Sequence, residues 1–142
     1  MKRQLYFAYG SNMDRDQMRF RCPRAQFLKT VKLTGFKFQI SARHYATVVE
    51  DPSSEVYGVL WNLSEECEES LDFYEGVSSG LYEKVYLDFS ESGLQNVLIY
   101  IDRTVELGKP KVGYLEKIIF AAEELGFSGE YLRGLESFRN EY

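Results

Sequence analysis

A short glycine-containing segment near the start of the chain could bind an anion. The apolar residues 5–9 predict a buried strand that ends at Gly10, and Ser11 or Asn12 is suited to cap a helix that follows. Such a junction leaves backbone N–H groups at the positive end of a helix, and glycine lets a ligand approach the backbone closely. The same pattern also describes an ordinary capped turn, so it does not by itself decide between a binding site and a loop.

Glu75 is the acidic side chain best placed for proton transfer. It falls at the end of a predicted helix, beside the negative helix pole and three residues from Asp72. Both neighbours disfavour a second negative charge and tend to raise the pKa of a carboxyl group. A raised pKa is what a general base at neutral pH requires. The alternative is a solvated residue at the end of an acidic helix.

Three tyrosines form another candidate group. Tyr82, Tyr100 and Tyr114 could close a pocket and direct their hydroxyl groups at a polar ligand. Packing of these rings in the hydrophobic core is the alternative.

The composition excludes several other kinds of site. The chain has 142 residues with one histidine and two cysteines, which are too few for a four-ligand zinc site or a disulfide framework. A net charge of −5 argues against a nucleic-acid-binding surface. There is no apolar run long enough for a membrane span, and the N-terminal apolar stretch is too short for a signal peptide. We therefore expect a cytoplasmic protein with reduced thiols.

The elements that must position these residues do not alternate regularly between strand and helix. Patterning predicts helices over 14–22, 64–76, 112–125 and 128–138, strands over 5–9, 27–33, 36–40, 46–49, 56–63, 81–89 and 97–101, and a turn at 51–54. This order favours an α+β fold over a doubly wound parallel sheet. The length fits a single domain, residues 1–142.

Five segments in consistent order resemble the γ-glutamylcyclotransferase family, within the broader avirulence-induced-gene-like grouping. They are residues 6–13 (YFAYGSNM), 55–61 (EVYGVLW), 71–77 (LDFYEGV), 79–82 (SGLY) and 111–119 (KVGYLEKII). Together they extend over almost the whole chain. One departure is the stretch 41–45, which stands where many relatives carry a glycine-rich segment. This stretch is a candidate for lining the acceptor side of the pocket, which leaves the leaving group in doubt.

The resemblance implies a fold, a reaction and a set of site residues. The fold would be a mixed sheet closed into a small barrel and flanked by helices. In the reaction, the α-amine of a γ-glutamyl compound attacks its own γ-carbonyl and releases 5-oxoproline and an amine or amino acid. Glu75 would be the catalytic acid and base. The substrate-binding residues would be Tyr6, Phe7, Ala8, Tyr9, Gly10, Ser11, Asn12, Tyr82, Tyr100 and Tyr114.

The same resemblance implies which partners to expect. The substrate would be a small γ-glutamyl molecule, and no metal or cofactor would be needed because the nucleophile is part of the substrate. The Ser11-Asn12 form of the opening motif favours γ-glutamyl amino acids or peptides. A same-fold enzyme for another γ-glutamyl amine or biosynthetic intermediate, and a non-catalytic small-molecule or protein-binding module, are the alternatives. We expect no nucleic-acid or membrane partner, and the oligomeric state stays open, with a homodimer among the alternatives.

Overall fold

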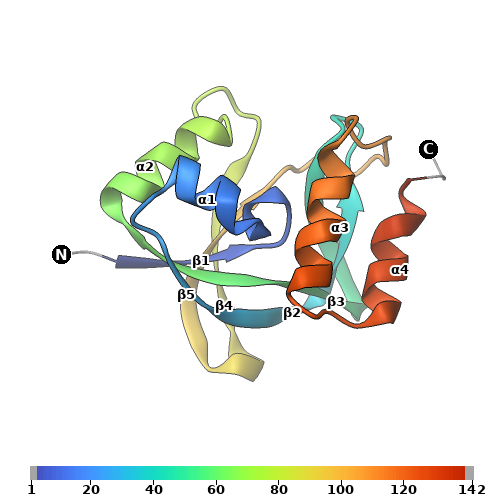
Figure 1. Ribbon diagram of the computed structural model, residues 1–142, viewed down its shortest axis with the longest axis horizontal. Coiled ribbons are helices and arrows are strands. Elements are labelled where there is room, and N and C mark those ends of the chain that lie inside the picture. Colours follow the sequence, from blue (N-terminus) through green and yellow to red (C-terminus); the bar gives the residue numbers. More distant parts are fainter. Residues whose placement is uncertain (1–2, 140–142) are drawn as a thin grey trace.

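A five-stranded mixed sheet forms the centre of the computed structural model, which describes residues 3–139 (Figure 1). The strands are β1 (Arg3–Ala8), β2 (Gln26–Ile40), β3 (Ala46–Ser64), β4 (Glu83–Phe89) and β5 (Leu94–Ile101). They lie in the order β2-β3-β1-β5-β4. The central strand β1 is antiparallel to β3 and parallel to β5. β1 therefore has a neighbouring strand on each side.

Helices lie in two pairs beside the sheet. They are α1 (Arg15–Arg21), α2 (Glu65–Tyr74), α3 (Tyr114–Glu124) and α4 (Gly129–Ser137), and two short 3₁₀ turns are η1 (Ser11–Met13) and η2 (Ser90–Ser92). Figure 1 shows α1 beside α2 on one side of the molecule and α3 beside α4 on the other. This mixture of elements confirms the predicted α+β class. Within residues 3–139, no helix combines the length and apolar character needed to cross a membrane.

Side-chain caps explain where three of the helices begin. The hydroxyl of Ser64 accepts a hydrogen bond from the N–H of Cys67, and Ser128 caps α4 in the same way. Both caps were predicted. The cap of α1 is Asp14, whose carboxylate accepts from the N–H of Asp16. The prediction that Ser11 or Asn12 caps this helix is therefore wrong, because η1 intervenes.

Two strands are longer than their patterns predict. The predicted strands 27–33 and 36–40 form one strand, β2, and the predicted strands 46–49 and 56–63 form one strand, β3. The ladder pairs Thr34 with Glu55 and then Phe36 with Glu50, so residues 51–54 have only Gly35 opposite them. The polar composition that predicted a turn at 51–54 thus marks a wide irregularity within the β2–β3 pairing.

The sheet does not close into a barrel, and this part of the predicted fold is wrong. Within residues 3–139, β2 pairs only with β3 and β4 pairs only with β5, so β2 and β4 are the two edges of the sheet. Closure would require a hydrogen-bonded ladder between these edges. Instead, a small cavity of about 130 Å³ lies between residues 32–36 of β2 and residues 87–91 at the end of β4. Side chains such as Phe89, which is buried, fill part of the remaining space.

A glycine in β3 allows the central strand to pack closely. A β-carbon on Gly58 would lie 2.4 Å from the carbonyl oxygen of Ala8 and 2.7 Å from the ring of Phe7. Phe7 is completely buried, and its ring packs edge-on against Phe89 at 5.1 Å between centroids. Gly58 therefore provides the space in which the aromatic core beneath the end of β1 assembles.

We predict that Gly58→Ala lowers the free energy of unfolding by at least about 2 kcal/mol, because the added methyl group meets backbone and a fixed ring. The matched control is Gly134→Ala in α4, where no atom lies within 4 Å of the new methyl group. This control should stabilise the protein by about 0.5–1 kcal/mol through helix propensity. Urea unfolding measures both changes. Equal stability of the two variants would contradict the packing described for Gly58.

Candidate active site

The loop that follows β1 is fixed by buried hydrogen bonds. Gly10 precedes η1, and its carbonyl oxygen accepts from the N–H of Met13 at 3.1 Å. The side chain of Asn12 is buried and donates to the hydroxyl of Tyr6 at 2.9 Å. The indole N–H of Trp61, on β3, donates to the carbonyl oxygen of Asn12 at 3.1 Å. The loop is thus held from the sheet side at both its backbone and its side chain.

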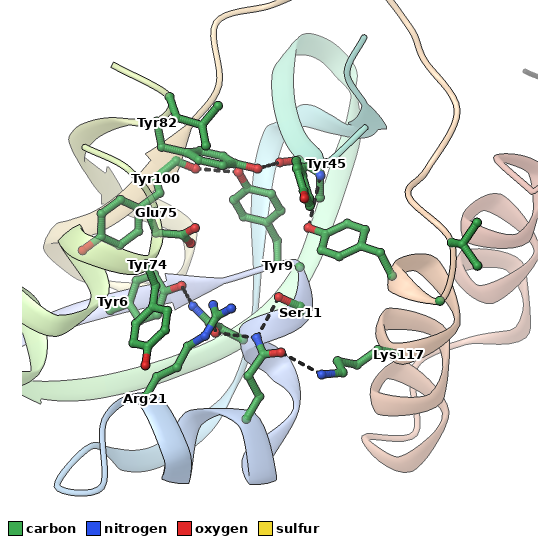
Figure 2. Close-up of a pocket in the computed structure, with 18 residues that line it drawn as sticks. Tyr6, Tyr9, Ser11, Arg21, Tyr45, Tyr74, Glu75, Tyr82, Tyr100 and Lys117 are labelled. Atoms are coloured by element: carbon green, nitrogen blue, oxygen red, sulfur yellow. Dashed lines mark hydrogen bonds between the residues drawn. The ribbon is translucent and has the colours of Figure 1, made fainter. Parts of the chain in front are cut away.

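A cavity of about 490 Å³ opens beside this loop (Figure 2). Its size is in the range of small-molecule binding sites. Among the residues that the structure describes, Arg21, Glu75 and Lys117 are the charged side chains that line it. Figure 2 shows Glu75 and Lys117 on opposite sides of the cavity, with tyrosine rings between and above them.

Three of the lining tyrosines give their hydroxyl protons to the protein. Tyr9 donates to the carbonyl oxygen of Tyr100 at 2.5 Å, and Tyr82 donates to the carbonyl oxygen of Ala46 at 2.5 Å. The hydroxyl of Tyr100 donates to Asp72 Oδ1 at 2.7 Å. Since a phenol has a single proton to donate, these three residues shape the wall and offer a ligand only acceptor atoms.

Two other tyrosines keep their hydroxyl protons available. Tyr6 Oη accepts from the Asn12 amide, and Tyr114 Oη accepts from the backbone N–H of Ala46 at 3.2 Å. Burial raises the pKa of both phenols above the usual value, so they are protonated at neutral pH. Tyr6 and Tyr114 can therefore donate hydrogen bonds into the cavity.

Glu75 stands at the point where α2 ends. Its backbone N–H donates to the carbonyl oxygens of Leu71 and Phe73, which closes the last turn of the helix. Gly76 follows with φ +63°, a conformation that suits glycine and turns the chain away from the helix axis. This C-terminal turn directs the Glu75 carboxyl group into the cavity, as Figure 2 shows.

The acidity of Glu75 follows from its surroundings. Burial raises the pKa of this carboxyl group to about 7, while the positive charge of Arg21 acts in the opposite direction. The sequence predicted a raised pKa from two neighbours, the negative pole of the helix and Asp72. The pKa is raised, but burial is the main cause and Asp72 is not among the causes, because its carboxylate is directed to Lys84 at 3.1 Å and to the hydroxyl of Tyr100.

Helix α1 contributes two side chains that the sequence prediction missed. Arg21 donates to Asn12 Oδ1 at 3.1 Å, and its guanidinium lies 4.6 Å from the ring centre of Tyr74. Gln17, one helical turn earlier, donates to Ser11 Oγ at 2.7 Å and to Asn12 Oδ1 at 2.9 Å. Gln17 and Arg21 are four residues apart, so they lie on one face of the helix that follows the loop. This spacing is the sequence pattern that could have indicated them.

Eight of the ten predicted substrate-binding residues line the cavity together with Glu75. They are Tyr6, Tyr9, Gly10, Ser11, Asn12, Tyr82, Tyr100 and Tyr114. Phe7 and Ala8 do not reach it: Phe7 packs in the core, and Ala8 is buried opposite Val59 in the β1–β3 ladder. Tyr45, from the candidate stretch 41–45, also lines the cavity. The lining residues that were not predicted are Gln17, Arg21, Ala46, Tyr74, Leu81, Val112, Gly113 and Lys117.

The donor chemistry of the cavity suits an organic ligand with charged ends. It combines one carboxyl group, two cationic side chains and hydroxyl groups around an enclosed space. Among residues 3–139, no group of three or more His, Cys, Asp or Glu side chains is arranged to hold a metal ion.

Comparison with known proteins identifies relatives of this chain in both sequence and structure. Residues 55–135 match the AIG2-like family. Mouse and bovine γ-glutamylcyclotransferases are each 32% identical, over 97% of this chain and 80% of the relative. A solved structure described as a γ-glutamyl cyclotransferase superposes with a TM-score of 0.83 at 30% identity, covering 99% of this chain and 91% of that one. YkqA from Bacillus subtilis, 23% identical with a TM-score of 0.82 over 99% of this chain and 55% of its own, shares the fold. The sequence match and the shared fold show that this chain belongs to the AIG2-like family, among the γ-glutamylcyclotransferases.

Proposed function

We propose that the protein releases 5-oxoproline from γ-glutamyl amino acids or related γ-glutamyl compounds. The α-amine of the substrate attacks its own γ-carbonyl carbon, the five-membered ring closes, and the γ-amide C–N bond breaks. The observation that carries this proposal is Glu75: among the described residues it is the one acidic side chain lining the cavity, and its pKa is about 7. The relatives are named γ-glutamylcyclotransferases, which supports a cyclising reaction of a γ-glutamyl group.

Glu75 can serve both proton transfers of this reaction. The α-ammonium group of the substrate must lose a proton before its nitrogen can attack. A carboxylate whose conjugate acid has a pKa of about 7 accepts that proton at a lower energetic cost than an ordinary carboxylate does. The protonated Glu75 then gives the proton to the leaving nitrogen as the C–N bond breaks. The attacking nitrogen loses a second proton when it becomes the lactam N–H, and the leaving amine takes up a second proton as it becomes an ammonium group. Both protons can pass through Glu75, which returns to its starting state in each cycle.

The remaining groups of the cavity can bind the ends of a γ-glutamyl head. Arg21 is a cation close enough to affect Glu75, so it is suited to the α-carboxylate while Glu75 faces the α-ammonium. The free hydroxyl protons of Tyr6 and Tyr114 can donate to the γ-carbonyl oxygen, where negative charge develops during attack. Holding the chain of the substrate in its ring-closing conformation contributes much of the rate.

Assays with a panel of γ-glutamyl amino acids and γ-glutamyl amines test the proposal, with 5-oxoproline measured by mass spectrometry. We expect stoichiometric 5-oxoproline and free amine or amino acid. Binding of these compounds without any turnover would instead indicate a binding module and would overturn the proposal.

Replacing Glu75 with glutamine should reduce kcat by at least about 10³-fold, because the amide keeps the size of the side chain but cannot exchange a proton. The fold should be retained. Glu69→Gln removes an exposed carboxylate from the same helix and should leave kcat within about twofold. A Glu75→Gln variant with more than about a tenth of the wild-type kcat would show that the proton transfers have been assigned to the wrong group.

The stability of the protein should depend on pH because the pKa of Glu75 is raised in the folded state. Because this pKa rises from 4.5 to about 7 on folding, the folded protein keeps a proton that the unfolded chain has lost. Wild-type stability should therefore fall as the pH rises through this window and level off above it. Glu75→Gln lacks this titration, so its stability relative to wild type should increase by up to about 3 kcal/mol across the window. Urea unfolding at both ends of the window measures the difference, with Glu69→Gln as control, and a pH-independent difference would contradict a buried carboxyl group.

Gly10→Val should raise KM at least about tenfold, with a smaller loss of stability. The backbone of Gly10 has φ −114° and ψ −137°, outside the regions that residues with a β-carbon favour, so valine strains the loop. Its β-carbon would lie 3.3 Å from Tyr114 Oη and 3.4 Å from the β-carbon of Ala46, so the branched methyl groups extend into the cavity. Steady-state kinetics together with thermal unfolding separate the two effects. An unchanged KM in a folded variant would remove the loop from the substrate site.

A further inference from the structure

The two cations of the cavity lie at different depths. Arg21 is partly buried and affects the acidity of Glu75, whereas Lys117 is exposed. None of the ion pairs formed within residues 3–139 involves either side chain. The cavity therefore presents two positive charges that the described protein does not neutralise by direct pairing, facing the single carboxyl group of Glu75.

A neutral amide orients the ammonium group of Lys117. Its Nζ donates to Gln17 Oε1 at 2.9 Å. The amide nitrogen of Gln17 donates to Ser11 Oγ at 2.7 Å and to Asn12 Oδ1 at 2.9 Å, which fixes the carbonyl of Gln17 toward the lysine. An ammonium group has three protons to donate, so two remain available when one is bound by Gln17. Lys117 is thus positioned without being neutralised.

Lys117 lies at the open end of the cavity. It follows Tyr114 by three residues in α3, which places both side chains on the same face of the helix. The neighbouring lining residue Val112 is fully exposed, while Tyr6 and Tyr100 at the other end are buried. Figure 2 shows Lys117 across the cavity from Glu75. A substrate with its reacting amine at Glu75 extends its leaving group toward this end.

We propose that Lys117 determines specificity for the leaving group by binding a carboxylate that the leaving group carries. This inference rests on the proposed function, because it takes the position of the γ-glutamyl head from it. The charges then match in full: Glu75 faces the α-ammonium, Arg21 the α-carboxylate, and Lys117 the carboxylate of a departing amino acid. A γ-glutamyl amine without that carboxylate leaves Lys117 without a charged partner.

The experiment compares two substrates of the same shape, γ-glutamyl-L-alanine and γ-glutamyl-L-alaninamide, which differ by one negative charge. With wild-type protein, kcat/KM should favour the acid by about threefold to fivefold, the upper part of the range expected for an exposed ion pair. Lys117→Met should remove this preference through a higher KM for the acid and leave the amide within about twofold. Lys117→Arg should retain the preference. The control Lys109→Met removes an equal charge from a residue that does not line the cavity and should preserve the ratio.

The outcomes separate the two proposals. An equal loss for both substrates in Lys117→Met would assign the lysine a structural role through Gln17 and overturn the inference, as would an unchanged ratio. If neither substrate yields 5-oxoproline, the proposed function is wrong. Titration calorimetry with Glu75→Gln, with and without Lys117→Met, still measures the ratio of the two dissociation constants, and a ratio that does not depend on Lys117 overturns the inference by itself.

Discussion

The buried side chain of Asn12 is the contact on which the rest of the site depends. Its amide nitrogen bonds Tyr6 of the central strand, and its oxygen accepts from Gln17 and Arg21 of α1. Its backbone carbonyl is bonded by Trp61 of β3. One residue therefore joins the sheet, the loop and the first helix in a place where unpaired polar atoms would be costly. Because every one of these bonds is directional, the loop and the Arg21 guanidinium take a fixed position relative to the sheet.

Burial, rather than pairing with another charge, determines the pKa of Glu75 in the cavity. Glu75 lies at a helix end where Gly76 turns the chain, and the surrounding aromatic rings withdraw its carboxyl group from water. The nearby acid Asp72 is neutralised by Lys84 and bonded by Tyr100, so it takes no part in the raised pKa. Two carboxyl groups three residues apart thus acquire different properties from different surroundings. Their surroundings thus separate a buried carboxyl group that lines the cavity from one that bonds Lys84 and Tyr100.

Local sequence signals predicted the elements better than they predicted the distant contacts. The serine caps of α2 and α4, the α+β class and about half of the cavity-lining residues follow from short patterns and from the family resemblance. The open sheet does not, because closure depends on how two edge strands far apart in the sequence meet. Lys117 was missed for the same reason. It lies 100 residues from Gln17, which accepts its hydrogen bond, and nothing in either helix alone indicates that the two side chains meet.

The central position of β1 has a consequence for the order in which the protein can assemble on the ribosome. β2 and β3 are neighbours in the sequence and can pair as soon as residue 64 is available. β1 is made first, yet its two neighbours in the sheet are β3 and β5, and β5 is complete only at residue 101. Contacts of such long sequence separation form late because the intervening chain must first be ordered. The strand that is synthesised before the other four is therefore among the last to gain both of its neighbours, and the loop at its end takes its final position with it.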